Sequence, residues 1–252
     1  MPGNTDLKFK LLVDEVAREI VATEHRTGGS FIRTPLMYPS GTSVIVRIEQ
    51  GDNRFFVSDF GLGYQESELM GAGLLYARHA HPIAETNGVR FDNQAFFVLE
   101  ASRDQLPGAV VTIANCSQEA TMRAADALAE KTFEDSKARL YERLVKIFTP
   151  KIVVKNFEVT GASHQKWRVS TIVNVPGTLP TIFEPVTKHA NSVASASMKF
   201  SDIALRDDAP ARVAVVQKRS EFGPLLTVLS RSASVIEDDT SSDRIKQLAS
   251  AA

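Results

Sequence analysis

The sequence predicts an α+β protein in which two α+β domains are joined by a helical segment. Strand-like and helix-like patterns alternate as far as residue 104, which predicts an N-terminal α+β domain over 1–104. Residues 105–150 are helical in pattern, and the alternation that resumes afterwards predicts a C-terminal α/β-type domain with a mixed sheet over 151–252. With 252 residues and 43% hydrophobic content, the chain is long enough to form two cores.

The predicted N-terminal domain starts with a helix and continues with short strands. Thr5 is placed to cap a helix that ends near Arg26, before Gly28 and Gly29. One face of this helix is predicted to carry Leu7, Leu11, Leu12, Val16 and Ile20. The turn Gly51-Asp52-Asn53 makes a hairpin of the strands on either side of it. The elements predicted after the first helix are strands at 31–36, 43–48 and 54–58, a helix at 64–78, and a hairpin of strands 89–91 and 95–100.

The connector begins at Pro107, a residue that is favourable in the first turn of a helix. Its helical pattern continues to Thr149, and a break is predicted near 131–135. Helices between strand-rich segments often form a brace or a dimer seam, so 107–149 is the segment through which a homodimer is expected. The elements predicted beyond it are strands at 153–159, 167–175, 181–186, 212–217 and 234–236, and helices at 190–205, 222–230 and 241–249.

Composition excludes several classes of protein. The net charge of −1 provides no global attraction to nucleic acid or to an anionic membrane. A single cysteine, Cys116, allows no internal disulfide and fits a reducing compartment. The N-terminal residues do not resemble a secretory signal, and no apolar run approaches the roughly 18 residues of a membrane-spanning helix. We therefore expect a cytoplasmic protein without a membrane partner.

Motifs for cofactor chemistry are missing from the sequence. Asp59-Phe60-Gly61 spells the metal-binding tripeptide of protein kinases, but the other kinase motifs do not precede it. No P-loop, dinucleotide fingerprint or Gly-x-Ser-x-Gly elbow occurs. His79 and His81 form a His-x-His pair without a third ligand nearby, and histidine also suits a helix C-terminus. The sequence thus predicts no cofactor and no metal.

The stretch Phe55–Gly63 ends an apolar strand on Asp59 and continues into a glycine-rich turn. Asp59 either caps this turn through backbone N–H groups, with Gly61 and Gly63 supplying its dihedral angles, or faces a ligand. Both interpretations remain open from the sequence.

A nuclease of restriction-endonuclease-like fold is compatible with the strand–strand–helix–strand order of the C-terminal domain. Such enzymes resemble one another in a strand-borne Asp followed by an acid-x-Lys on the next strand, where the acids hold Mg²⁺. Lys218 ends a suitable strand, but Val216 stands where the acid is required. Glu184 and Asp202 are the remaining candidates, so the catalytic set of this alternative is Glu184, Asp202 and Lys218.

Basic residues are concentrated around the end of the connector. Arg139, Arg143 and Lys146 share one helical face, which would suit phosphate groups or an acidic protein partner, although a solvated helix face is the commonest explanation. The complete basic set is Lys137, Arg139, Arg143, Lys146, Lys151 and Lys155.

One family resemblance follows from these motifs. Thr34-Pro35, the strand 43–48 and the block Phe56–Gly61 resemble an uncharacterised bacterial and prophage domain, domain of unknown function eighteen-twenty-eight, over roughly residues 10–100. Residues 151–238 are similar in strand and helix order to a second uncharacterised domain that often follows it. The resemblance implies a bacterial or mobile-element setting, in which defence, counter-defence and toxin–antitoxin proteins are common, and it implies no catalytic residue.

Together these observations favour a non-enzymatic binding protein that acts through protein–protein contacts, with nucleic acid as a further partner along the basic set. The alternative is a metal-dependent nuclease or phosphodiesterase of restriction-endonuclease-like fold with a degenerate site.

Overall fold

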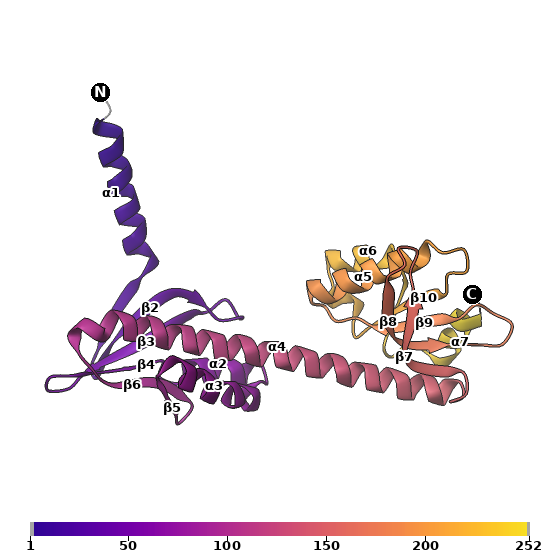
Figure 1. Cartoon of the computed structure of the whole chain (residues 1–252), viewed down its shortest axis with the longest axis horizontal. Helices are drawn as coiled ribbons and strands as arrows, with labels where there is room; N and C mark the ends of the chain where they lie inside the picture. Colours follow the sequence, from indigo (N-terminus) through magenta and orange to yellow (C-terminus); the bar gives the residue numbers. More distant parts are fainter. Residues whose placement is uncertain (1–2, 251–252) are drawn as a thin grey trace. The chain divides into compact units, whose positions relative to one another are not determined.

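The computed structural model describes residues 3–250 and confirms the α+β class (Figure 1). The chain forms two compact units, Met1–Glu130 and Lys131–Ala252. The division lies within the helical segment, so its first part belongs to the N-terminal unit and its remainder to the C-terminal unit. None of the described helices combines the length and the apolarity needed to cross a membrane.

The N-terminal unit is built on a six-stranded antiparallel sheet with the order β1-β2-β3-β4-β6-β5. Its core lies between this sheet and the helices, where Val46, Val57 and Phe96 pack with Tyr76 and Ile113. The elements are α1 (Gly3–Ile20), β1 (Ala22–Arg26), β2 (Gly29–Met37), β3 (Ser43–Gln50), β4 (Phe55–Ser58), α2 (Leu62–Leu69), α3 (Gly73–Asn87), β5 (Arg90–Asp92), β6 (Ala95–Ala101) and η1 (Arg103–Gln105).

Two predictions about helix boundaries in this unit are wrong. The first helix ends at Ile20, and Ala22–Arg26 instead pairs with β2 as an edge strand. The capping predicted for Thr5 concerns a side chain outside those that the structure describes. The single helix predicted at 64–78 is divided into α2 and α3 at Gly71, whose left-handed φ of 79° ends the first of them.

The helical segment is one continuous helix, α4 (Leu106–Ile147), of 42 residues. The break predicted near 131–135 is absent from it. Thr132 and Asp135 are weak helix formers, but each costs only about 0.7 kcal/mol relative to Ala, which packing at both ends outweighs. Ile113 and Ala114 of α4 belong to the N-terminal core, whereas Leu140 and Leu144 belong to the C-terminal unit.

The C-terminal unit has a mixed sheet, as expected, and its five strands lie in the order β11-β10-β9-β8-β7. The first three strands in sequence pair antiparallel, and the last three pair parallel. Phe200 and Leu229 pack on one face with Ile182, and Leu144 and Ile245 pack in a second cluster. The elements are β7 (Val153–Thr160), β8 (Lys166–Val173), β9 (Thr181–Pro185), α5 (Ala190–Ala204), β10 (Ala211–Val216), η2 (Arg219–Glu221), α6 (Pro224–Ser230), β11 (Ser234–Glu237) and α7 (Ser242–Ser250).

Candidate functional sites

Asp59 is fully buried at the end of β4 and joins three segments of the N-terminal unit. Its Oδ1 accepts the N–H of Gly61 at 3.1 Å and the N–H of Phe96 at 2.9 Å. Its Oδ2 accepts the hydroxyl of Ser117 at 2.7 Å, and the Tyr76 hydroxyl lies 3.5 Å away. The carboxylate therefore connects its own turn to β6 and α4.

The surroundings of Asp59 contain hydroxyls and N–H groups but no basic side chain among its hydrogen-bond partners. Burial raises the pKa of Asp59 above its usual value, although the bonds from Ser117, Gly61 and Phe96 oppose the shift. The Tyr38 hydroxyl extends the network by bonding Ser117 Oγ at 2.8 Å. Chemically, this arrangement holds a turn in place through internal donors.

The two glycines of the turn have different roles. Gly61 adopts a left-handed φ of 72° and is the N-cap residue of α2. Gly63 permits a close approach, because a Cβ there would lie 2.4 Å from Ser117 Oγ and 2.6 Å from the Tyr76 hydroxyl oxygen. These contacts agree with the turn-capping interpretation of Asp59; a ligand-facing role stays a prediction.

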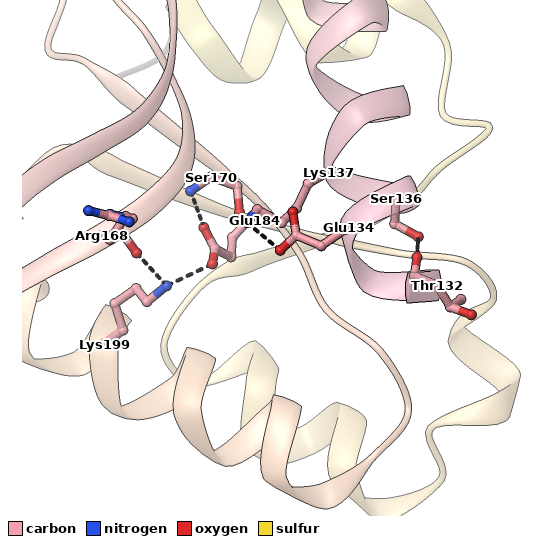
Figure 2. Close-up of polar contacts among 8 residues, drawn as sticks. All are labelled: Thr132, Glu134, Ser136, Lys137, Arg168, Ser170, Glu184 and Lys199. Atoms are coloured by element: carbon pink, nitrogen blue, oxygen red, sulfur yellow. Dashed lines mark hydrogen bonds and ion pairs between the residues drawn. The ribbon is translucent and has the colours of Figure 1, made fainter. Parts of the chain in front are cut away.

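A second buried acid, Glu184 on β9, pairs with Lys199 of α5 (Figure 2). Lys199 Nζ donates to Glu184 Oε1 at 2.7 Å and to the Arg168 carbonyl at 2.8 Å. Glu184 Oε2 accepts the Ser170 N–H at 2.6 Å. The side chains of Lys199 and Glu184 are only 12% and 7% exposed, so this is a buried ion pair with additional hydrogen bonds. The sequence reasoning missed Lys199, since nothing in its spacing connects it to Glu184.

The other two members of the nuclease set do not join Glu184 in this pair. Asp202 accepts the Trp167 indole N–H at 2.6 Å and bonds the N–H and hydroxyl of Ser163, each at 2.8 Å. These bonds, that of Trp167 first, lower the pKa of Asp202. Glu184 lies across from Ala214 in parallel strands, and Lys218 lies beyond the end of β10 at Val216.

The basic set divides into side chains with internal contacts and side chains that remain exposed. Arg143 donates to the carbonyls of Asp238 and Thr240. Arg139 donates to Ser136 Oγ at 3.2 Å but stays exposed, as Lys146 does. Arg143 therefore binds the segment before α7 to α4. Arg139 and Lys146 remain as the accessible bases of the predicted helical face.

The remaining bases lie elsewhere on the C-terminal unit. Lys137 pairs with Glu134 at 2.9 Å, and Lys155 lies 5.4 Å from the ring centre of Tyr141. Lys151 is exposed, just beyond the end of α4. Lys137 and Tyr141 are one helical turn apart and share one side of α4, and Lys155 lies against Tyr141 on that side. Arg139 and Lys146 lie on a different side of the helix, so the basic set forms two separate groups.

The absence of a metal centre stays a prediction. Within residues 3–250, no group of three or more His, Cys, Asp or Glu side chains is placed to hold a metal ion. The His81 ring lies 5.0 Å from that of Phe91 in an edge-on contact. Cys116 is buried, and burial raises the pKa of its thiol to about 11.

Helix α1 carries an exposed apolar surface, and its residues differ from the face predicted from the sequence, which included Leu7 and Leu11. Every side chain over 7–20 is exposed. At about 100° per residue, five apolar positions fall within one stripe of this helix, whereas Leu7 and Leu11 lie on its opposite side. We call these five residues the α1 stripe, and they are between 47% and 64% exposed: Phe9, Leu12, Val13, Val16 and Ile20. The sequence could not predict that this stripe is exposed, because an amphipathic pattern does not reveal whether other elements cover its apolar side.

The homodimer seam predicted at 107–149 has less apolar surface than its pattern suggested. Most apolar side chains of α4 lie in the two units' cores, and Val111 and Met122 are its large apolar residues that are 58% and 49% exposed. The seam stays a prediction.

The chain matches no family model, no curated protein and no solved structure. The resemblance of residues 10–100 to the prophage domain therefore remains an expectation, and the function is argued from the geometry.

Proposed function

We propose that this chain is a non-enzymatic protein that acts by protein–protein contact and that the α1 stripe is its contact surface. The observation that carries the proposal is the exposure of Phe9, Leu12, Val13, Val16 and Ile20 on one side of a helix. Contiguous exposed apolar surface on a soluble protein marks an interaction site. An amphipathic helix that presents residues at i, i+3, i+4 and i+7 is a common element of such contacts.

The state of the two buried acids supports a role without catalysis. Asp59 and Glu184 each have both carboxylate oxygens in internal hydrogen bonds or an ion pair. A metal ion or a substrate would have to displace these donors, at the cost of leaving buried groups unpaired.

Replacing Val16 with Asp tests the stripe. A charge placed at the centre of an apolar contact should cost about 2 kcal/mol or more, equivalent to a 30-fold or greater loss of affinity. The matched control is Leu11→Asp, the same change on the opposite side of the same helix, which should change affinity less than about threefold. A partner recovered by tagged pull-down, with and without nuclease treatment, is purified and its dissociation constant is measured for wild type and both variants. Equal loss in the two variants, or loss in neither, would refute the role of the stripe.

The alternative function, a metal-dependent nuclease or phosphodiesterase, is favoured by one observation. Glu184 lies on a strand of the mixed sheet with a lysine amine 2.7 Å from its Oε1, although that lysine comes from α5. The position across from Glu184 on β8 is Ser170, as the pairing of Thr171 with Phe183 shows, so the second acid of such a site is replaced by serine. Val186 stands two positions after Glu184, where the strand-borne lysine would be.

Under the leading proposal, the purified chain should not cleave single-stranded or double-stranded nucleic acid with Mg²⁺ or Mn²⁺. The assay compares wild type with Glu184→Gln, after urea unfolding has shown that the variant is folded. Cleavage that requires the metal and disappears in folded Glu184→Gln would establish the alternative and overturn the non-enzymatic proposal.

A further inference from the structure

The antiparallel sheet of the N-terminal unit has a second apolar surface outside the core. Antiparallel sheets commonly present polar side chains on the face that is not packed. Here the strands alternate between core residues such as Val46 and Phe96 and outward residues, several of which are also apolar. We call these the outer sheet face; none belongs to the core, and all are half-buried or exposed: Phe31, Ile45, Phe56, Phe97 and Leu99.

On β3 the outer sheet face is interrupted by Arg47, which lies across from Phe31. Arg47 pairs with Glu49 at 3.1 Å, and its guanidinium lies 4.6 Å from the ring centre of Phe60. The rings of Phe56 and Phe97 lie 5.7 Å apart.

Two exposed bases border the face, because Arg33 lies across from Ile45 and Arg90 lies across from Phe97. Exposed acids border it as well, because Glu24 lies across from Phe31 and Asp92 lies across from Ala95. The outer sheet face is thus an apolar surface with one internal ion pair and with charges of both signs at its edges.

The connection between α1 and the sheet prevents the helix from covering this face in its own chain. Only Val21 separates the end of α1 from the start of β1. Helix-to-strand connections that reverse direction normally use about 2 to 6 residues. β1 is held by its pairing with β2, and Figure 1 shows α1 directed away from the sheet. Short hinges of this kind favour the exchange of an element between copies.

We propose that α1 of one copy packs its stripe on the outer sheet face of a second copy, reciprocally, in a twofold symmetric dimer. This inference rests on the proposed function and names the partner of the α1 stripe as this same chain. The dimensions agree, since the α1 stripe from Phe9 to Ile20 extends about 17 Å and the four strands from β2 to β6 span about 14 Å. Glu15 and Glu19, one turn apart beside the stripe, supply negative charge to match Arg33 and Arg90.

Cross-linking between variants that each carry one introduced cysteine tests where the helix binds. Cys116 is buried, so an introduced cysteine reacts first with a short bismaleimide. Val16→Cys and Leu99→Cys chains are co-expressed with different tags, purified through both tags, and treated with the reagent. We expect a covalent dimer that carries both tags, at least tenfold above the yield from the matched pair Leu11→Cys and Leu99→Cys. Light scattering of the wild type should give twice the chain mass of 27.6 kDa.

Three results would overturn the proposal. A cross-linked monomer from the double variant Val16→Cys/Leu99→Cys, without a mixed dimer, would place α1 on its own sheet. Cross-linking of Val16→Cys to itself in preference to Leu99→Cys would indicate pairing of two α1 helices. A mass of 27.6 kDa at every concentration, without cross-linking, would exclude a second copy.

The last of these results is distinguishable from failure of the proposed function. A monomer whose complex with a different purified protein is weakened by Val16→Asp and not by Leu11→Asp would keep the α1 stripe as a contact surface and remove the second copy as its partner. A monomer without any complex that depends on the stripe would remove both.

Discussion

Replacing Asp59 with Ala is expected to lower the free energy of unfolding of the N-terminal unit by about 3 kcal/mol or more. The substitution leaves the N–H of Phe96 and the hydroxyl of Ser117 without their buried acceptor. It also releases Gly61 from the turn that Asp59 holds. A domain has a total stability of about 5–15 kcal/mol, so a loss of this size removes a large part of it.

The measurement is urea unfolding followed by far-ultraviolet circular dichroism, together with hydrogen exchange of a peptide that contains Phe96. The matched control is Asp52→Ala, an exposed acid in the β3–β4 turn, which should change stability by less than about 0.5 kcal/mol. Equal effects of the two substitutions would contradict a structural role for Asp59.

The same comparison has a predicted pH dependence. Because burial raises the pKa of Asp59 in the folded chain, the folded state holds its proton more tightly than the unfolded state, where the pKa is about 3.9. This contribution to stability is complete below about pH 4 and is lost as pH rises through the raised folded pKa. The stability difference between wild type and Asp59→Ala should therefore shrink as pH increases above about 4. A difference that grows with pH would show that the hydrogen bonds, and not burial, dominate the pKa.

Replacing Lys199 with Met is expected to destabilise the C-terminal unit by about 3 kcal/mol, because it leaves Glu184 as a buried charge without its cation. Removing one partner of a buried pair costs more than the pair contributes, since the remaining ion is poorly solvated. Glu184 would retain the Ser170 N–H as a donor, which limits the loss.

Trp167 provides the probe for this experiment, since it is the one tryptophan of the sequence and lies on β8 of the C-terminal unit. Urea unfolding is followed by its fluorescence in wild type and in Lys199→Met. The control is Lys188→Met, because Lys188 and Glu221 form an exposed pair at 3.3 Å that should contribute less than about 1 kcal/mol. A Lys199→Met variant as stable as Lys188→Met would show that the pair is not needed for folding and would strengthen the nuclease alternative.

Local pattern was sufficient to determine the class of fold. Alternation of period two at 43–48 and amphipathic helical spacing at 138–148 each reflect a side-chain direction that the backbone fixes over a few residues. The predicted ends of helices and strands were less accurate where no alternation of buried and exposed residues marks them. Ala22–Arg26 is exposed along its whole length and was assigned to a helix, although it forms a strand. Its conformation depends on hydrogen bonds to β2, which no local pattern encodes.

By itself, the sequence determined the α+β class, the mixed C-terminal sheet and the strand-end position of Asp59, because these follow from periodicity and turn residues within short windows. Only the tertiary structure decided what the charged and apolar side chains meet. It joined Asp59 to Phe96 and Ser117, which are 37 and 58 residues away, and it gave Glu184 the amine of Lys199 in place of Lys218. It also left the α1 stripe exposed. These contacts depend on how distant segments pack, and packing is a property of the whole unit that spacing along the chain does not contain.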